Sequence, residues 1–164
     1  MSHKIETGVD AKVAYLGPEG TYSQLAALEF FGADAKLVNC TSIDDVFAAV
    51  EKGAVSYGIV PVENSTEGAI NNTQDCLVDS SSRIIGEQIV SIEHSLLAQT
   101  RTSKSDIRKI ASHKQSLAQC RAYLAKNFPK IEQIECSSNA EAAILAQTNA
   151  DTAAIASELA GRVY

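Results

Sequence analysis

Three short stretches of this sequence combine side chains that could hold and transform a small anion. In the first, VPVENSTEG, an apolar run stops at Pro61, and Asn64, Ser65 and Thr66 follow it before an expected helix. Amide and hydroxyl groups can donate hydrogen bonds to carboxylates, and ligands of α/β proteins bind where strands end. The stretch therefore predicts a binding site, and the alternative is a solvated loop in which one residue caps the helix.

The second stretch, GPEGTYS, places two hydroxyl groups at the start of another expected helix. Gly17 and Gly20 permit a tight turn, after which Thr21 and Ser23 lie beside backbone N–H groups that have no partner inside the helix. Such a loop could bind a carboxylate or a phosphate, although Thr21 could equally serve only as an N-cap. The stretch lacks the lysine of a P-loop and the glycine spacing of a dinucleotide fingerprint.

The third stretch, SHKQSLAQC, adds a titratable group to amides and hydroxyls. Ser112 and His113 end an expected strand, and Gln119 flanks the apolar face of the helix that follows. Imidazole suits proton transfer near neutral pH, so His113 is a candidate general acid, but a histidine at a strand end is more often a structural hydrogen-bonding group. His94, inside an apolar run, is expected to be a hydrogen-bonded histidine of a sheet.

Composition limits the partners of such a site. The 164 residues carry a net charge of -6 and the 14 basic residues are scattered, so nucleic acid is not expected as a partner. No apolar run approaches the roughly 20 residues of a membrane helix and the N-terminus has no signal-peptide core, which predicts a cytoplasmic protein without membrane contact. The four cysteines lack zinc-site spacing, so they are expected to be reduced and mostly buried, with no metal or cofactor bound.

The elements that must position these residues alternate between strands and helices. Ser42 with Asp45, and Ser138 with Glu141, have the spacing of helix caps. Helices are expected over 21–32, 42–53, 68–80, 116–128 and 139–148. Strands are expected over 12–17, 35–40, 56–62, 109–113, 131–137 and 152–157, with one or two more in 83–100. This alternation predicts an α/β fold with helix-flanked sheets and parallel crossovers.

A polar serine run at 79–82 divides the elements into two groups. We expect a polar lead over 1–11, a first lobe over 12–80 and a second lobe over 81–164, whose last residues begin a return to the first lobe. A cleft between two lobes would explain why polar loops follow strands in both halves.

Together and in this order, GPEGTYS, VPVENSTEGAI and SHKQSLAQC closely resemble the motifs of the prephenate dehydratase catalytic domain, from Val13 to Tyr164. The resemblance implies the two-lobe fold of type II periplasmic binding proteins, with mixed sheets and an active-site cleft. It also implies that a small-molecule substrate, prephenate, is converted to phenylpyruvate with loss of water and carbon dioxide, on the route to phenylalanine. Neutral donors could hold the two substrate carboxylates without a metal.

The same resemblance implies roles for individual residues. Asn64 and Gln119 are expected to contribute to catalysis. Glu63 and Glu67 would repel a dianion, so they are expected to have structural or capping roles. Carboxylate binding or shaping of the cleft is expected of Thr21, Ser23, Ser65, Thr66, Ser112 and His113.

The sequence departs from the family pattern in two places. Lys114 stands where the family usually has a proline after the histidine, and the Thr-Arg-Phe motif does not occur in these 164 residues. We therefore expect a truncated catalytic domain with an incomplete first lobe, whose apolar edge a second copy would cover in a homo-oligomer. A non-catalytic binding module for a small carboxylic acid and an arogenate dehydratase remain as alternatives.

Overall fold

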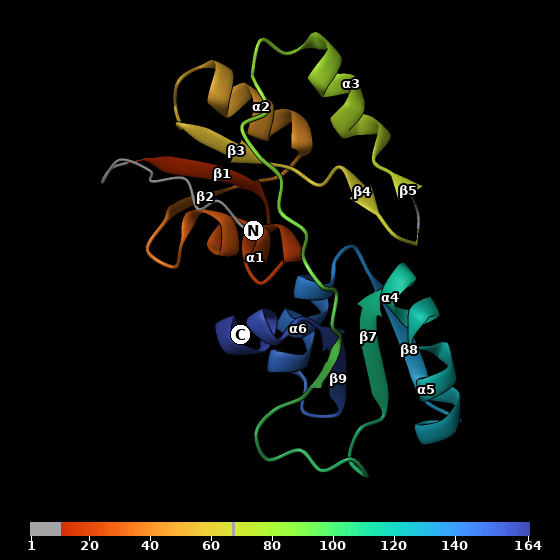
Figure 1. Cartoon of the computed structure of the whole chain (residues 1–164). Helices are drawn as coiled ribbons and strands as arrows, with labels where there is room; N and C mark the ends of the chain where they lie inside the picture. Colours follow the sequence, from red (N-terminus) through yellow and green to blue (C-terminus); the bar gives the residue numbers. More distant parts are fainter. Residues whose placement is uncertain (1–10, 67) are drawn as a thin grey trace. The chain divides into compact units, whose positions relative to one another are not determined.

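The computed structural model describes residues 11–66 and 68–164, so Glu67 and nearly all of the expected polar lead lie outside the described residues. Its contacts divide the chain into two compact units (Figure 1). Among the described residues, the first unit comprises 11–18 together with those of Tyr22–Ser91, and the second comprises Glu19–Thr21 and Ile92–Tyr164. The main division falls after residue 91, whereas the serine run suggests a boundary at residues 80 and 81.

The first unit is built on a parallel sheet of three strands in the order β2-β1-β3. The central strand, β1 (Lys12–Leu16), buries Val13, Ala14 and Tyr15 almost completely. Its neighbours β2 (Lys36–Cys40) and β3 (Tyr57–Ile59) are more exposed. The helices of this unit are α1 (Tyr22–Phe31), α2 (Ile43–Glu51) and α3 (Asn71–Asp79). The predicted strand–helix alternation is confirmed here.

Helix α2 forms for the reason that its sequence indicates. Ser42 is the N-cap, and its side-chain oxygen accepts a hydrogen bond from the Asp45 backbone N–H at 3.1 Å. This bond satisfies one of the N–H groups that a helix start leaves without a partner. Val46 points into a small core with Ala14 of β1 and with Val55, so the helical spacing of apolar residues correctly identifies the buried face.

The segment after α3 differs from its prediction. Residues 80–94 form neither helix nor strand, and β6 (Ser95–Leu97) is the part of the predicted 83–100 region that pairs with another strand. Ile84 and Ile89 are 75% and 87% exposed. The β-branched residues favour extended chain, but a strand also needs a hydrogen-bonding neighbour along its length. The local sequence shows the preference for extended chain, but it does not show whether a neighbouring strand is present.

The second unit has a mixed sheet in the order β6-β9-β7-β8. Strand β7 (Lys109–His113) pairs in parallel with β8 (Glu132–Cys136) and β9 (Thr152–Ala156), and β6 runs antiparallel to β9. Every residue of β9 is buried. The helices are α4 (Lys114–Gln119), α5 (Arg121–Asn127), α6 (Asn139–Thr148) and α7 (Glu158–Val163).

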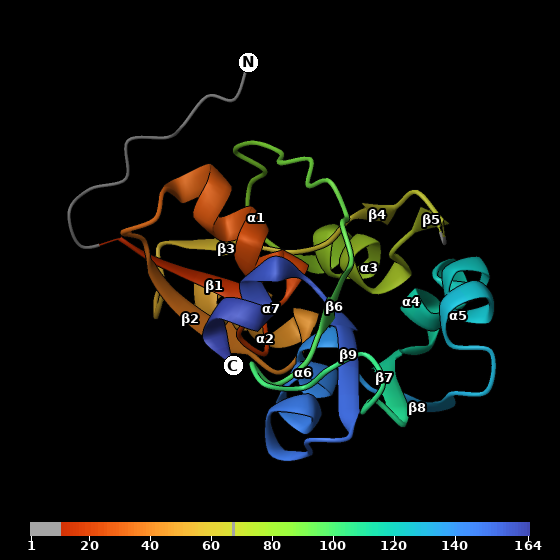
Figure 2. The same ribbon diagram turned by 90° about the horizontal axis from the view of Figure 1, so that it is seen from below.

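Side chains of this sheet alternate between two separate cores. Ile110 and Ile155 join Leu117 and Leu124 from α4 and α5. The neighbouring strand residues face an alanine-rich cluster with α6 and α7, made of Ala111, Ala142, Ala143, Ala146, Ala154, Ala156 and Ala160. Successive strand residues point to opposite faces, so helices cover both sides of the sheet. Figure 2 shows α6 lying along β9. The α/β fold with helix-flanked sheets is thereby confirmed.

Two local predictions need correction. The helix predicted over 116–128 begins earlier, at Lys114, and divides into α4 and α5 at Cys120, whose backbone leaves the helical region at ψ 5°. The four cysteines are free, as predicted, but each is partly rather than fully buried. Within the described part of the chain, no helix is long and apolar enough to cross a membrane.

Candidate active site

The VENSTEG stretch forms a small hairpin in place of the predicted loop. Strands β4 (Glu63–Asn64) and β5 (Gly68–Ala69) pair antiparallel, with Asn64 opposite Gly68. The Asn64 side-chain oxygen accepts a hydrogen bond from the Thr66 backbone N–H at 2.9 Å. This local bond stabilises the turn and orients the amide group, so its donor nitrogen faces away from the turn. Ser65 and Thr66 are exposed at the hairpin tip.

Helix α3 anchors the hairpin. Thr73 is fully buried and donates its hydroxyl to the Pro61 carbonyl at 2.6 Å, while the Ile70 N–H donates to the Val62 carbonyl at 2.8 Å. The N-cap position of α3 is Ile70, which makes no side-chain capping bond. A capping role for Glu63 is therefore wrong, and Glu67 lies outside the described residues.

A side-chain contact joins α3 to α2 and supports the same region. The Asn72 amide nitrogen donates to the Asp44 carboxylate at 3.0 Å. This hydrogen bond is the main cause that holds the pKa of Asp44 below its usual range, so the carboxylate is ionised at neutral pH. The contact links the start of α3 to the start of α2, and none of the predicted ligand-binding residues takes part in it.

The GPEGTYS loop is divided between the two units. The Gly17 N–H donates to the Cys40 carbonyl at 2.9 Å in the first unit. In the second unit, the Gly20 carbonyl accepts from the Ser157 hydroxyl at 2.8 Å. Gly20 has a φ of +77°, and an added Cβ would lie 2.9 Å from the Ala160 Cα, so the position requires glycine. Thr21 belongs to the second unit and Ser23 to the first, and both are half-buried.

The SHKQS turn is held by a side chain that none of the three motifs contains. Asn139, the first residue of α6, accepts through Oδ1 from the Ser116 hydroxyl at 3.0 Å and from the His113 N–H at 3.2 Å. The Ser112 hydroxyl also lies 3.0 Å from this oxygen and donates to the Ile155 carbonyl at 2.6 Å. One amide oxygen thus fixes the strand end and the helix start. An asparagine one position after a capping serine is the signal in the sequence that could have indicated it.

The two remaining polar side chains of this stretch are also oriented by hydrogen bonds. His113 caps α4, and its Nδ1 accepts from the Gln115 N–H at 3.3 Å, which places the proton of the neutral imidazole on Nε2. His94 Nε2 lies 2.9 Å from Gln119 Oε1. Because an amide oxygen only accepts, His94 is the donor, and the Gln119 amide nitrogen faces away from it. The prediction that His94 lies inside a strand is wrong, because it precedes β6.

The structure therefore groups the predicted residues by unit. Ser112, His113 and Gln119 lie together at the end of β7 and along α4, in the second unit. Asn64, Ser65 and Thr66 lie together at the hairpin of the first unit. Both groups offer neutral donors, and among the described residues no three His, Cys, Asp or Glu side chains gather as a metal site would require. Such groups can bind an anion and stabilise departing oxygen.

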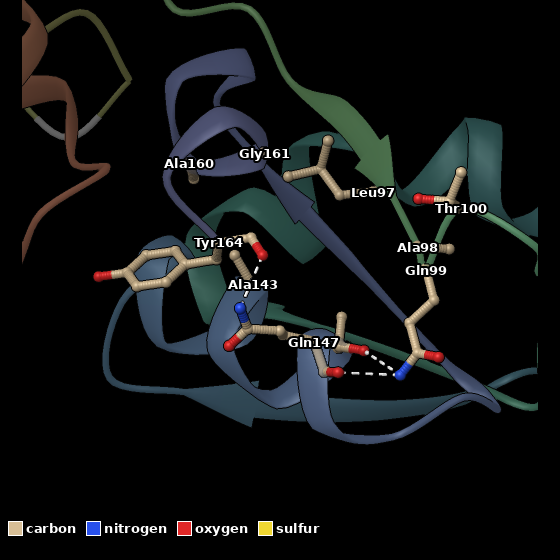
Figure 3. A pocket seen from close by; sticks show the side chains of 10 residues that line it. Leu97, Ala98, Gln99, Thr100, Ala143, Gln147, Ala160, Gly161 and Tyr164 are labelled. Carbon is tan, nitrogen blue, oxygen red and sulfur yellow. Dashed lines mark hydrogen bonds between the residues drawn. The ribbon is translucent and has the colours of Figure 1, made fainter.

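A pocket of about 270 Å³ in the second unit is separate from these residues (Figure 3). The side chains of both glutamines that line it already donate hydrogen bonds. Gln99 Nε2 donates to the Gln147 carbonyl at 2.9 Å, and Gln147 Nε2 donates to the Tyr164 carbonyl at 2.8 Å. Its other lining residues are mainly small or apolar, and none of the predicted site residues borders it. We therefore do not assign the chemistry to this pocket.

The chain is a two-unit α/β protein in which neutral hydrogen-bond donors follow strands in each unit. The prephenate dehydratase family model matches residues 13–164. A bifunctional chorismate mutase/prephenate dehydratase of Pseudomonas aeruginosa is 47% identical over 153 residues, which cover 93% of this chain and 42% of that relative. The chain belongs to the prephenate dehydratase family.

Solved structures support the fold assignment. A prephenate dehydratase of Arthrobacter aurescens in complex with L-Phe superposes with a TM-score of 0.86 at 31% identity, covering 94% of this chain and 52% of that chain. A protein described as a novel type of quorum quenching acylase, GqqA, has a TM-score of 0.84 at 25% identity, covering 93% of this chain and 55% of that chain. One architecture thus occurs in proteins described by different activities.

Proposed function

We propose that this chain binds prephenate and carries residues that convert it to phenylpyruvate in phenylalanine biosynthesis. The observation that supports this most is the family match over residues 13–164, which includes all three polar stretches in order. The chain spans 42% of the length of the Pseudomonas relative, so the activity of the whole relative is extended to this chain only as a proposal.

The reaction sets clear demands on the site. The bond between the ring and its carboxylate breaks, the electron pair enters the ring, and the carbon–oxygen bond to the ring hydroxyl breaks. Carbon dioxide leaves, and a proton converts the departing hydroxide to water. The site must therefore bind a dianion, stabilise the departing oxygen and supply or relay one proton.

Asn64 and Gln119 are proposed to donate hydrogen bonds to the substrate during this reaction. Each side-chain oxygen already accepts a bond, from the Thr66 N–H and from His94 respectively. An amide that is oriented before the substrate binds needs less reorganisation in the transition state. The orientation of both groups supports their proposed role as donors.

Supporting roles are proposed for the other predicted residues. The exposed hydroxyls of Ser65 and Thr66 can reach a ligand, and Thr21 and Ser23 are proposed to bind its carboxylates. The buried Ser112 is proposed to shape the site, because its hydroxyl donates to the Ile155 carbonyl inside the sheet. His113 is proposed to bind the substrate by donating a hydrogen bond from Nε2–H, the nitrogen opposite its bond to Gln115.

The cellular setting is also part of the proposal. We propose that the protein is cytoplasmic, acts on a small soluble acid and has no nucleic-acid or membrane partner. The exposed apolar residues of the 80–94 segment, including Ile84 and Ile89, support a homo-oligomer. Sedimentation of the purified chain over a range of concentrations would measure its assembly state.

The direct test is formation of phenylpyruvate from prephenate by the 164-residue chain, measured against the uncatalysed rate at neutral pH. A second assay would insert residues 13–164 of this chain into the Pseudomonas relative, in place of the matching segment, and repeat the measurement. The chimaera supplies the rest of the relative's length. An inactive chimaera that is folded would contradict the proposal, and binding without turnover in both proteins would favour a binding module.

Arogenate should be assayed in parallel with prephenate, because it has an amino group where prephenate has a keto group. Faster product formation from arogenate would identify an arogenate dehydratase. The variants Asn64→Ala and Gln119→Ala in the same chimaera are expected to lower product formation while keeping the unfolding midpoint, which makes them reference variants for the assay.

A further inference from the structure

Gln115 carries a polar group that the described part of the protein does not pair. It is the second residue of α4, and its amide nitrogen is buried without an acceptor among the described residues. Folded proteins pair nearly all buried polar groups, since an unpaired donor has lost its hydrogen bonds to water. The Gln115 nitrogen is therefore an exception that calls for a partner.

The chain around Gln115 is held by hydrogen bonds, although the side-chain nitrogen of Gln115 has no acceptor among the described residues. Its backbone N–H donates to His113 Nδ1 at 3.3 Å, and the next residue, Ser116, donates its hydroxyl to Asn139 Oδ1 at 3.0 Å. The residues on both sides of the Gln115 side chain are thus held by hydrogen bonds. The unpaired nitrogen is a consequence of a defined turn.

The position of Gln115 connects it to the proposed substrate residues. Gln115 and Gln119 are four residues apart on α4, so their side chains project from the same helix face. The amide nitrogen only donates hydrogen bonds, and its natural partner is an oxygen with lone pairs. The Gln115 side chain as a whole is partly exposed, and the last torsion of glutamine is soft, so the amide can turn toward a ligand at little cost.

We propose that the Gln115 amide nitrogen donates a hydrogen bond to a carboxylate oxygen of the bound substrate. Gln115 is then a substrate-binding residue in addition to Gln119, and its unpaired state in the free protein is satisfied when the ligand binds. This inference rests on the proposed function, since the acceptor is one of the prephenate carboxylates.

The test combines ligand affinity with the stability of the free protein. Gln115→Met keeps the length of the side chain and removes the donor, while Gln115→Glu places a negative charge beside an anionic ligand. Calorimetric titration of prephenate into the 164-residue chain gives the affinity, and thermal unfolding without ligand gives the stability. Gln133→Met is the matched control, because Gln133 is exposed on β8.

The expected result is a loss of prephenate affinity of about tenfold or more in Gln115→Met, and a larger loss in Gln115→Glu. Removal of an unpaired buried donor should leave the unfolding midpoint of Gln115→Met unchanged or raised. The control should bind prephenate as the wild type does.

Two results would overturn the inference alone. Wild-type affinity in Gln115→Met would show that the amide does not contact the ligand, and a lowered unfolding midpoint in Gln115→Met would show that the amide is an internal structural donor. Failure of the wild-type chain to bind either prephenate or arogenate is a different result, which overturns the proposed function and this inference with it.

Discussion

The two units of this protein share the same alternation of strands and helices but differ in how completely the residues of these elements are buried. In the second unit all five residues of β9 are buried, and helices cover both faces of the sheet. In the first unit burial is concentrated on β1, α1 and α2, while β2 is largely exposed and Ile84 and Ile89 face solvent. Because apolar burial is the main stabilising contribution, we expect the second unit to be the more stable of the two.

The polar groups of the candidate site also differ in burial between the two units. The hairpin of the first unit presents exposed hydroxyls beside Asn64, whereas the second unit ties Ser112, His113 and Ser116 to the side-chain oxygen of one asparagine. An exposed hairpin can adapt to a ligand, and a buried network fixes donors in place. We therefore expect substitutions in the second unit to affect geometry and stability together.

The largest effect on stability is expected from Leu124→Ala. Leu124 is 1% exposed in the core of the second unit, and removing its side chain should lower the free energy of unfolding by about 2–5 kcal/mol. The matching change in the first unit, Val46→Ala, removes less apolar surface and should cost about 2 kcal/mol. Hydrogen exchange resolved by segment would assign each loss to its unit. Equal acceleration in both units for either variant would contradict the comparison.

The next effect concerns turnover and compares one residue from each unit. Asn64→Ala and Gln119→Ala should each lower prephenate turnover by more than about tenfold, the scale of one lost transition-state donor. Turnover is measured in the active chimaera, with unfolding midpoints as a control for folding. If only one variant lost activity, the site would depend on the unit to which that residue belongs. Unchanged turnover in both would remove these residues from the proposed site.

A smaller effect should separate Asn139→Ala from Asn139→Asp. Alanine removes the oxygen that accepts from His113 and Ser116, so turnover should fall by about tenfold. Aspartate keeps an acceptor oxygen and suits the start of a helix, so it should restore most of the activity. Equal losses of turnover in the two variants, at equal unfolding midpoints, would show that this oxygen does not position the site.

The smallest expected effect is a loss of folding stability at acidic pH. The Thr41 hydroxyl is the main cause that lowers the pKa of Asp45 in the first unit, and the Ser137 hydroxyl does the same for the pKa of Glu141 in the second. A lowered carboxyl pKa in the folded state adds stability above the unfolded pKa, which is lost as the pH falls through the folded pKa. Stability should therefore decline below about pH 4.

Unfolding measured from neutral pH into acid would test this sign in Asp45→Asn and Glu141→Gln. Each variant should show a shallower decline than the wild type, and the change should be confined to the unit that carries the substitution. A decline as steep as that of the wild type in both variants would show that other carboxylates determine the acid sensitivity.

Local signals in the sequence were enough for most elements. The capping serines before α2 and α6 accept hydrogen bonds from Asp45 and Glu141, as their spacing predicts. Helix α6 occupies the predicted residues 139–148. These features depend on residues within one or two helical turns, which a single sequence displays directly. The order of the three polar stretches along the chain was also enough to indicate the family.

The features that the sequence missed depend on distant residues. The β-branched segment 83–94 forms neither helix nor strand, and a short hairpin occupies the predicted loop around Asn64. The contact between His94 and Gln119 spans 25 residues, and the one between Ser112 and Asn139 spans 27. Pairing partners at such separation are not encoded in local propensity.

The sequence by itself thus determined the family, the α/β alternation, the helix caps and the residue types of the candidate site, because these follow from composition and short-range spacing. The tertiary structure decided which strands pair, which amides are oriented and that the nitrogen of Gln115 is buried without an acceptor among the described residues. The physical reason is that burial and hydrogen-bond pairing are satisfied across the whole folded chain, and each depends on neighbours that only folding brings together.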